Sequence, residues 1–168
     1  TLIALVLVGL ALPTSAHAAE QRIELVERPH QLLDGKFIDD ELATLLAPDG
    51  RLGSLVFTPK VSRAHWYIDA ALLDEVRDMA DGYDLVSKED GVGLDVAAAW
   101  LAQLRIATTG ATVTPIAYGN PDLKLAKRLA PSELAFYYAY GAERLGTFLN
   151  RPVSVSYTHL TLPTTPYV

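Results

Sequence analysis

The chain has 168 residues, half of them apolar and a fifth charged, which is typical of a globular protein and excludes a disordered tail. Its formal net charge is −6 and it has no run of Lys or Arg, so the sequence predicts no nucleic-acid partner and no basic surface for anionic lipid. It has no cysteine, which excludes disulfide bonds and thiol-ligated zinc.

The first 18 residues form an uncharged apolar stretch that ends in the small-x-small sequence Ala16-His17-Ala18. This is the pattern of the apolar region and cleavage site of a secretory signal peptide. The apolar run ends at Pro13, short of the roughly 20 residues that a membrane span needs. Because no basic segment precedes it, we interpret 1–18 as a signal peptide truncated at its start. We therefore expect an exported protein at the extracellular face of the cell envelope, and the lack of cysteine favours a bacterial one.

The C-terminal residues have a different character. From Val155 the string VSYTHLTLPT resembles the in-frame translation of a transposase adapter used in preparing sequencing libraries. On this resemblance residues 154–168 are a non-native tail and native sequence stops near Ser154. A Thr/Pro-rich extracellular linker is the alternative. We predict no structure from Ser154 onward and do not consider His159 as a ligand.

Between these ends, three segments have the features of β-strands. Residues 22–27 alternate polar and apolar side chains, and residues 64–69 are rich in aromatic and β-branched residues. Residues 111–118 form the third, in which Pro115 indicates an edge strand or a bulge.

Helical patterns follow each predicted strand. The first covers 39–46, with Asp39 as its N-cap and the turn Pro48-Asp49-Gly50 after it. The second follows Asp69 and presents one apolar stripe, and 94–108 presents another before Gly110. Further helices are predicted from Asn120, with Pro121 at the first helical position, and over 132–149. The side chains predicted to be buried are Leu72, Leu73, Val76, Met79, Ala80, Tyr83, Ala97, Trp100, Leu101, Leu104, Leu134, Tyr138, Ala142, Leu145 and Phe148.

Alternation of strands and helices predicts the α/β class with a parallel sheet. The three strand–helix units of residues 19–153 neither close a barrel nor complete a doubly wound sheet. We therefore predict a partial α/β domain, an incomplete (β/α) barrel-like sheet truncated at the C-terminus. A fourth strand is expected at Arg151-Pro152-Val153.

Candidate functional residues lie where the predicted strands end, because active sites of parallel α/β proteins gather at this edge. After the first strand, Arg28 suits binding of a carboxylate or phosphate, and His30 suits a general base. The alternative is a solvent-facing loop stiffened by Pro29.

Asp69 ends the second strand, with the candidate ligand contact Trp66 on the same strand. Its carboxylate suits a general acid or base, but it is equally placed to cap the next helix, which we prefer. After the third strand, Tyr118 suits stacking on a sugar ring, and Asn120 and Asp122 follow it. Helix capping explains Asn120 and Asp122 without chemistry. Asp69 and Asp122 are the strand-end carboxylate pair that a glycosidase would use.

The sequence predicts no metal site and no cofactor. Outside the two ends only His30 and His65 remain, and they form no His-x-x-x-His pair. No nucleophile elbow, phosphate-binding loop or dinucleotide fingerprint is present in the sequence.

Seven short motifs carry a resemblance that covers nearly all of residues 19–153. They are Arg28–His30, Phe37–Leu42, Ala47–Leu52, Trp66–Leu72, Met79–Tyr83, Ala99–Leu101 and Ala117–Asp122. In this order they resemble a family of actinobacterial envelope proteins of unknown function, often encoded beside the peptidoglycan-precursor flippase. The resemblance implies a secreted protein, commonly held by a C-terminal transmembrane helix, with a central domain like the (β/α) barrels of glycosidases and polysaccharide deacetylases.

The chain departs from that family at three points. Ala70 stands where proline is usual, and Asn120 where an aspartate is common. The usual β-sandwich between signal and barrel-like part is missing. The family brings no known catalytic residue to this chain. We therefore expect an envelope protein that binds cell-wall glycan or takes part in wall assembly, with a glycoside hydrolase or polysaccharide deacetylase as the alternative.

Overall fold

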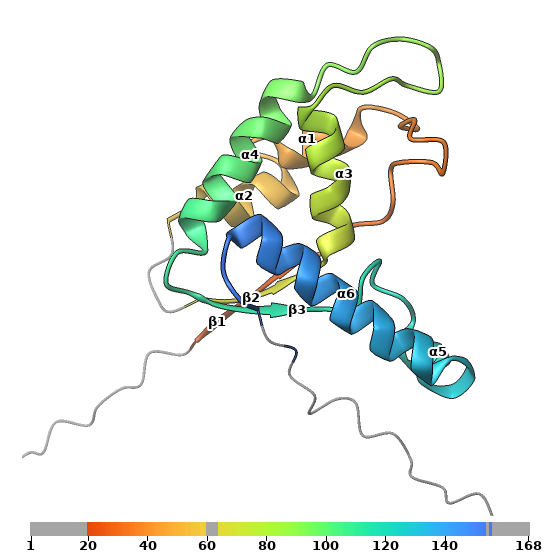
Figure 1. The fold of residues 1–168 in the computed structure, drawn as a ribbon. Coiled ribbons are helices and arrows are strands. Elements are labelled where there is room, and N and C mark those ends of the chain that lie inside the picture. The colour runs from red at the N-terminus through yellow and green to blue at the C-terminus, as the bar shows by residue number, and fades with distance from the viewer. Residues whose placement is uncertain (1–19, 60–63, 154, 156–168) are drawn as a thin grey trace, which may run out of the picture.

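A computed structural model of the chain describes residues 20–59, 64–153 and 155. The predicted signal peptide and, apart from Val155, the predicted tail lie outside these residues. Figure 1 shows the elements in chain order. They are β1 (Gln21–Leu25), α1 (Glu41–Leu46), α2 (Arg51–Phe57), β2 (Ala64–Ile68), α3 (Ala70–Ala80), α4 (Leu94–Ala107), β3 (Thr112–Pro115), α5 (Leu123–Leu129) and α6 (Pro131–Leu149).

Within the described residues the strands form a three-stranded parallel sheet in the order β1-β2-β3. Ile23 of β1 lies opposite Trp66 of β2, and Trp66 lies opposite Val113 of β3. The predicted α/β class with a parallel sheet is therefore confirmed. The sheet is open, and its strand order follows the chain order.

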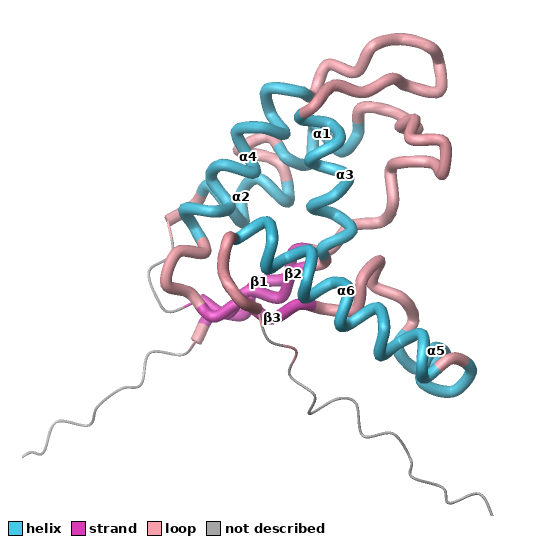
Figure 2. The backbone as a smooth tube through the Cα atoms, in the orientation of Figure 1, coloured by secondary structure: helices cyan, strands magenta, loops and turns pink. Residues whose placement is uncertain are grey.

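The two faces of the sheet differ in polarity. On β1 and β2 the side chains of Ile23, Leu25, Trp66 and Ile68 are buried, whereas the alternate residues are half-buried or exposed. The helices lie on one side of the sheet in Figure 2, and the buried side chains belong to the core that these helices share. The other face carries polar and aromatic contacts, including a hydrogen bond of 2.7 Å between His65 Nε2 and Thr114 Oγ1.

Helices α1 to α4 and α6 contribute buried apolar side chains to one core that they share with the strands. The stripe predicted for α4 is buried in full, as Ala97, Trp100, Leu101 and Leu104. Trp100 is completely buried, and its Nε1 donates a hydrogen bond of 3.1 Å to the carbonyl oxygen of Leu52. This bond joins α4 to α2 inside the apolar core and satisfies the polar atom of the indole ring.

Several predicted boundaries differ from the structure. Helix α2 was not predicted, because the turn at 48–50 reads as the end of helical structure rather than as a link between two short helices. Helix α1 begins at Glu41 with Asp40 in the N-cap position, while the Asp39 carboxylate accepts from the Glu41 amide at 2.9 Å. Residues 151–153, expected to be a strand, have no regular structure.

No helix in the described part of the chain is long and apolar enough to cross a membrane.

Gly53, in the first turn of α2, lets this helix lie close to the backbone at the end of α1. A Cβ atom at this position would lie 1.7 Å from the carbonyl oxygen of Ala47. We expect Gly53→Ala to lower the free energy of unfolding by more than about 3 kcal/mol, because overpacking against a fixed backbone exceeds the usual cost of core overpacking. Urea unfolding followed by the fluorescence of the buried tryptophans measures this. Ser54→Ala, on the exposed side of the same helix, is the control and should change stability by less than about 0.5 kcal/mol.

Candidate functional site

The loops that leave the C-terminal ends of the strands meet at one edge of the sheet. The Asp69 amide donates to the Leu25 carbonyl oxygen at 3.0 Å, and the Ile116 amide donates to that of Ile68 at 3.1 Å. Parallel pairing therefore continues just past the ends of the strands. Side chains that follow β1, β2 and β3 gather at this edge, as the sequence predicts.

Asp69 fastens the loop after β3 to the start of α3. Its side chain is 2% exposed, and Oδ1 accepts hydrogen bonds from the amides of Ala71 at 2.9 Å and Gly119 at 3.0 Å. The bond from Ala71 is a helix cap, which agrees with the preferred interpretation of this residue. Burial raises the pKa of the Asp69 carboxyl despite these amide bonds, which favour the charged form.

Asp74 is the polar centre on the β3 side of this edge. Its carboxylate accepts from the hydroxyl of Tyr118 at 3.0 Å and from Nε of Arg144 at 3.0 Å, with a second bond from Nη2 of Arg144. Burial and the neighbouring Asp74 charge raise the pKa of the Tyr118 hydroxyl, so this group is a hydrogen-bond donor at neutral pH. The hydrogen bond to Asp74 raises the pKa of Arg144. A paired Arg and carboxylate thus hold the tyrosine in place.

Glu75, the next residue of α3, holds the loop after β1. Its carboxylate oxygens accept from the backbone amides of His30 at 3.2 Å and Gln31 at 3.5 Å. Burial raises the pKa of the Glu75 carboxyl. Adjacent acidic residues of α3 therefore bind the loops of opposite edge strands.

An aromatic cluster borders Tyr118 on the surface of α6. The Tyr118 ring meets the Tyr140 ring edge-on at 4.8 Å between centroids, and Phe136 stacks beside Tyr140 at 5.8 Å. Phe136 is 61% exposed and Tyr137, which contacts it, is 39% exposed. Gly141 permits the close approach of α6, because a Cβ there would lie 3.0 Å from the carbonyl oxygen of Ile116. The result is a surface of exposed rings next to fixed polar groups.

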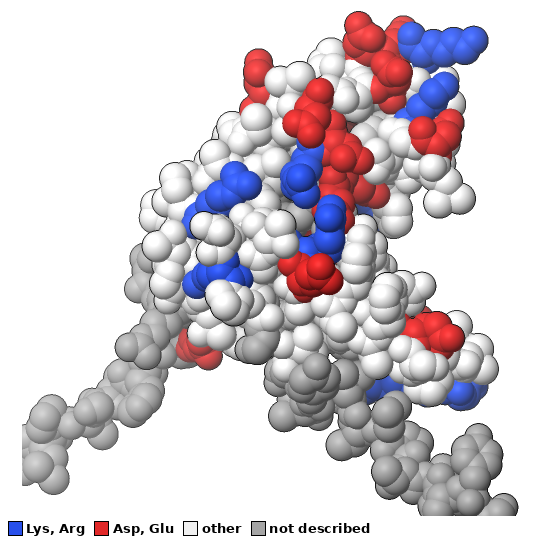
Figure 3. All heavy atoms as spheres, viewed as in Figure 1, with Lys and Arg blue, Asp and Glu red and all other residues white. Residues whose placement is uncertain are grey.

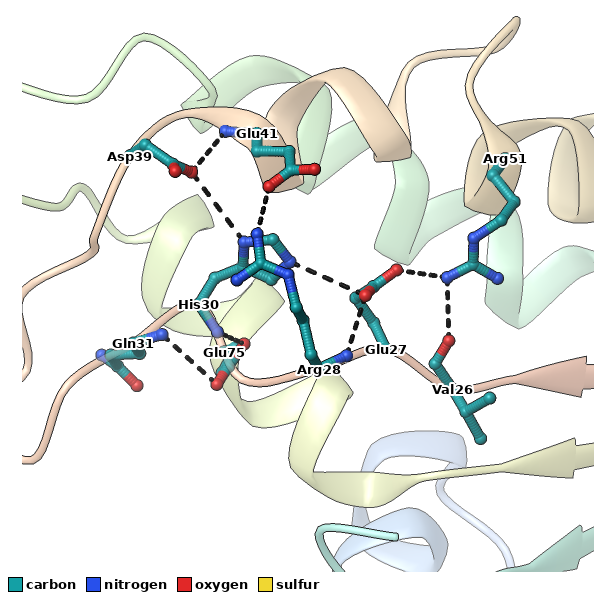
Figure 4. Close-up of polar contacts among 9 residues, drawn as sticks. All are labelled: Val26, Glu27, Arg28, His30, Gln31, Asp39, Glu41, Arg51 and Glu75. Atoms are coloured by element: carbon teal, nitrogen blue, oxygen red, sulfur yellow. Dashed lines mark hydrogen bonds and ion pairs between the residues drawn. The ribbon is translucent and has the colours of Figure 1, made fainter.

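A second cluster of charged residues follows β1. Arg51 forms an ion pair with Glu27, and Arg28 forms one with Glu41. Figure 4 shows the His30 ring between Asp39 on one side and Glu27 on the other. Although burial opposes it, hydrogen bonds from the Arg28 amide and from Arg51 lower the pKa of Glu27, so this carboxylate is charged.

His30 is completely buried within this second cluster. Its Nδ1 lies 3.9 Å from Asp39 Oδ1 and its Nε2 lies 4.0 Å from Glu27 Oε1, and within the described residues neither nitrogen has a hydrogen-bond partner. A buried polar atom without a partner costs about 1–3 kcal/mol. Burial, assisted by the Arg28 charge, lowers the pKa of His30, so the imidazole is neutral at neutral pH. Ligand atoms of His30, Asp39 and Glu41 lie within 4.8 Å of one another, so this group of the described residues has the ligand types and spacing of a candidate metal site.

The structure separates the other predicted site residues. Asp122 is exposed and caps α5, where its Oδ1 accepts from the Leu125 amide at 2.9 Å. The prediction that Asn120 caps this helix is wrong. Asn120 has a φ of 43°, in the left-handed region that asparagine tolerates, and its amide donates to Ala117 at 2.9 Å. Trp66 is completely buried, so packing in the core occupies its surface.

Sequence reasoning did not find the partners of these residues. Asp39 and Glu41 have the pattern of acidic residues at a helix start, and nothing local connects them to His30. The rings of Phe136, Tyr137 and Tyr140 lie within one predicted helix. The excess of aromatic residues over the predicted apolar stripe of that helix is the signal that could have revealed them.

Charge is unevenly distributed over the visible face. In Figure 3 acidic side chains gather over α3 and over the loops beyond its end, whereas both acidic and basic side chains lie around α5 and the start of α6. Asp34, Asp78, Asp81 and Asp84 line a hollow of about 450 Å³ in this acidic region. The residues of the acidic hollow and those of the aromatic cluster are different, so the two are distinct regions.

Comparison with known protein families and with curated proteins finds no match for this chain. The assignment of a role therefore depends on the site itself.

The hydrogen bonds of Asp69 predict a structural role of measurable size. Asp69→Ala removes the cap of α3 and leaves the Gly119 amide, whose bond to Asp69 is part-buried, without its acceptor, so we expect a loss of about 2–4 kcal/mol in unfolding free energy. Asp69→Asn keeps the acceptor oxygen and should recover most of it. Asp122→Ala is the matched control at an exposed cap and should cost about 1 kcal/mol or less. Equal losses for Asp69→Ala and Asp122→Ala in chemical denaturation would show that burial of Asp69 adds nothing.

The raised pKa of Asp69 predicts a pH dependence with a definite sign. The folded protein holds this proton more tightly than the unfolded chain does, so the protonated group contributes stability that is lost as the pH rises through the folded pKa. The unfolding free energy of the wild type relative to Asp69→Asn should therefore fall as the pH rises above the ordinary range of an aspartate. Denaturant melts of both proteins between acidic and neutral pH measure this difference. A difference that rises with pH instead would mean that the amide bonds outweigh burial.

Proposed function

We propose that this chain belongs to an exported envelope protein that binds cell-wall glycan at the aromatic cluster of Tyr118, Phe136, Tyr137 and Tyr140. The single observation that carries the proposal is the exposure of Phe136 and Tyr137 beside a tyrosine fixed by Asp74 and Arg144. Exposed aromatic rings offer apolar faces for the C–H groups of a sugar, and the flanking polar groups offer hydrogen bonds to its hydroxyls.

The position of the cluster in the fold supports this proposal. It lies at the C-terminal edge of the strands, where parallel α/β proteins place their ligands. The strand order β1-β2-β3 and the helices on one side of the sheet are features of a barrel-like arrangement, in contrast to a doubly wound sheet. We therefore propose that the sheet is part of a (β/α) barrel-like domain whose polar face, with His65 and Thr114, is directed inward.

Export is supported by residues 1–18, with the cleavage pattern Ala16-His17-Ala18. The resemblance to actinobacterial envelope proteins, which rests on seven ordered motifs, points to the same compartment. Cell-wall glycan is the polymer that a protein in this place would meet.

A glycoside hydrolase that uses Asp69 and Asp122 has less support. Both carboxylates accept amide hydrogen bonds at the start of a helix, Asp69 at α3 and Asp122 at α5. A glycosidase needs its two carboxylates on either side of one sugar bond, one of them as a proton donor. Helix capping explains both residues without a catalytic role. Burial does raise the pKa of the Asp69 carboxyl, which is the direction that a proton donor needs.

Co-sedimentation of the chain with purified, insoluble wall glycan tests the proposal. We expect Phe136→Ala to weaken binding about fivefold, because the loss of ring stacking is worth about 1 kcal/mol. Phe136→Trp should retain binding, because the indole ring keeps an aromatic face. Leu129→Ala is the matched control, since Leu129 is 68% exposed on neighbouring α5 but has no ring.

The outcomes separate a sugar-binding surface from a merely adhesive one. Equal weakening by Phe136→Ala and Leu129→Ala would mean general hydrophobic adhesion, and no binding by the wild type would remove the proposal. Release of reducing ends from the glycan, abolished by Asp69→Asn, would favour the hydrolase instead.

A further inference from the structure

We propose that His30, Asp39 and Glu41 bind a divalent transition-metal ion, Zn²⁺ or a chemically similar first-row ion. The ligand atoms come from the loop after β1 and from the start of α1, and they lie within 4.8 Å of one another. This cluster is separate from the aromatic surface of α6, so the inference does not depend on glycan binding.

The buried imidazole is the first reason for a metal. His30 is fully buried and its ring nitrogens lack hydrogen-bond partners within the described residues, yet Nδ1 points toward Asp39 at 3.9 Å. A metal ion between the two would satisfy the nitrogen and the carboxylate together. Imidazole and carboxylate are the ligands that zinc takes in proteins when thiolates are absent.

The geometry requires side-chain movements on the order of an ångström. Around a tetrahedral zinc ion with ligands at about 2.0–2.2 Å, the ligand atoms lie about 3.4 Å from one another. The 3.9 Å between His30 Nδ1 and Asp39 Oδ1 therefore has to shorten by about 0.5 Å, and the widest separation in the group by up to about 1.4 Å. Asp39 and Glu41 are half-exposed, so their side chains have room to rotate.

Neighbouring residues hold these ligands in position. The Ile38 amide donates to the His30 carbonyl oxygen at 2.9 Å, which returns the chain to His30 just before Asp39. The Glu41 amide fixes the Asp39 carboxylate, and Glu75 fixes the His30 backbone. On the far side of the ring, Glu27 lies 4.0 Å from Nε2, where it would accept the second N–H of a metal-bound histidine. Metal-ligating histidines usually donate their second N–H to a carboxylate, a backbone carbonyl or water.

Arg28 is the internal competitor for this site. Its guanidinium forms an ion pair with Glu41, on a side chain that is about half exposed and has room to swing away. A metal ion has to displace this cation from Glu41. Removal of the Arg28 charge should therefore strengthen metal binding, whereas a purely structural cluster of ion pairs would only be weakened by it.

Isothermal titration of the purified 168-residue chain with Zn²⁺, after treatment with EDTA, tests the site. We expect one equivalent to bind, and we expect Asp39→Asn and Glu41→Gln each to weaken binding by about a hundredfold, at the upper end of what loss of a supporting partner costs. Arg28→Gln should strengthen it about tenfold, the effect of removing a like charge a few ångströms from an ion. Titration with Co²⁺ should give visible absorption bands that disappear in His30→Asn.

The variants are chosen so that folding and binding stay distinguishable. Asp39 and Glu41 are at the surface, and Asn at 39 keeps the oxygen that accepts from the Glu41 amide, so these proteins should melt like the wild type. His30→Asn is in the core, so its result counts only if its circular dichroism is native. Asp34→Asn and Glu133→Gln, exposed carboxylates outside the cluster, should bind Zn²⁺ as the wild type does. Binding that is unaffected by Asp39→Asn and Glu41→Gln, or absent in both the wild type and Arg28→Gln, would overturn the proposal.

Discussion

The edge of the sheet where the strands end depends on carboxylates from a single unit of the chain, β2 and the helix that follows it. Asp69 accepts amide hydrogen bonds from both α3 and the loop after β3, Asp74 accepts from Tyr118 and Arg144, and Glu75 accepts from the amides that follow β1. Burial of Asp69 and Glu75 disfavours their charged forms and raises the pKa of each. Donors from the neighbouring loops offset that cost, and a buried acceptor with several donors fixes its loops more firmly than exposed ion pairs would.

The arrangement on α3 also explains why two separate regions form at one edge. Asp74 and Glu75 are consecutive, and successive residues of a helix point about 100° apart. Asp74 therefore reaches the loop after β3 and helix α6, where the aromatic rings lie, whereas Glu75 reaches the loop after β1, where His30 is buried. One turn of α3, itself fixed by the Asp69 cap, sets the position of both regions. The two regions share a support but have no ligand residue in common.

How far the sequence predicts this structure depends on how local each signal is. Alternation in residues 22–27 and the apolar stripe of 94–108 are local patterns, and both gave the correct element. Helix α2 was not predicted because the segment 51–57 is short and contains Gly53. Glycine has a low helix propensity, and this one is required by its close contact with Ala47. Asn120 and Asp122 flank a proline and are both good caps, so only the left-handed backbone of Asn120 decides between them. The burial of His30 depends on a loop that returns to it eight residues later, at Ile38, which no periodicity records.

The burial of His30 among carboxylates also requires a cause of its own. If this position served packing alone, an apolar side chain of similar size would fill the space without leaving polar atoms unsatisfied. If it served electrostatics alone, a protonated histidine would suit the surrounding Asp39, Glu41 and Glu27, yet burial and the Arg28 charge lower its pKa and keep it neutral. A buried imidazole that faces carboxylates and lacks a hydrogen-bond partner within the described residues is placed as a metal ligand would be. On this proposal, the Arg28 guanidinium neutralises the Glu41 carboxylate when no metal is bound.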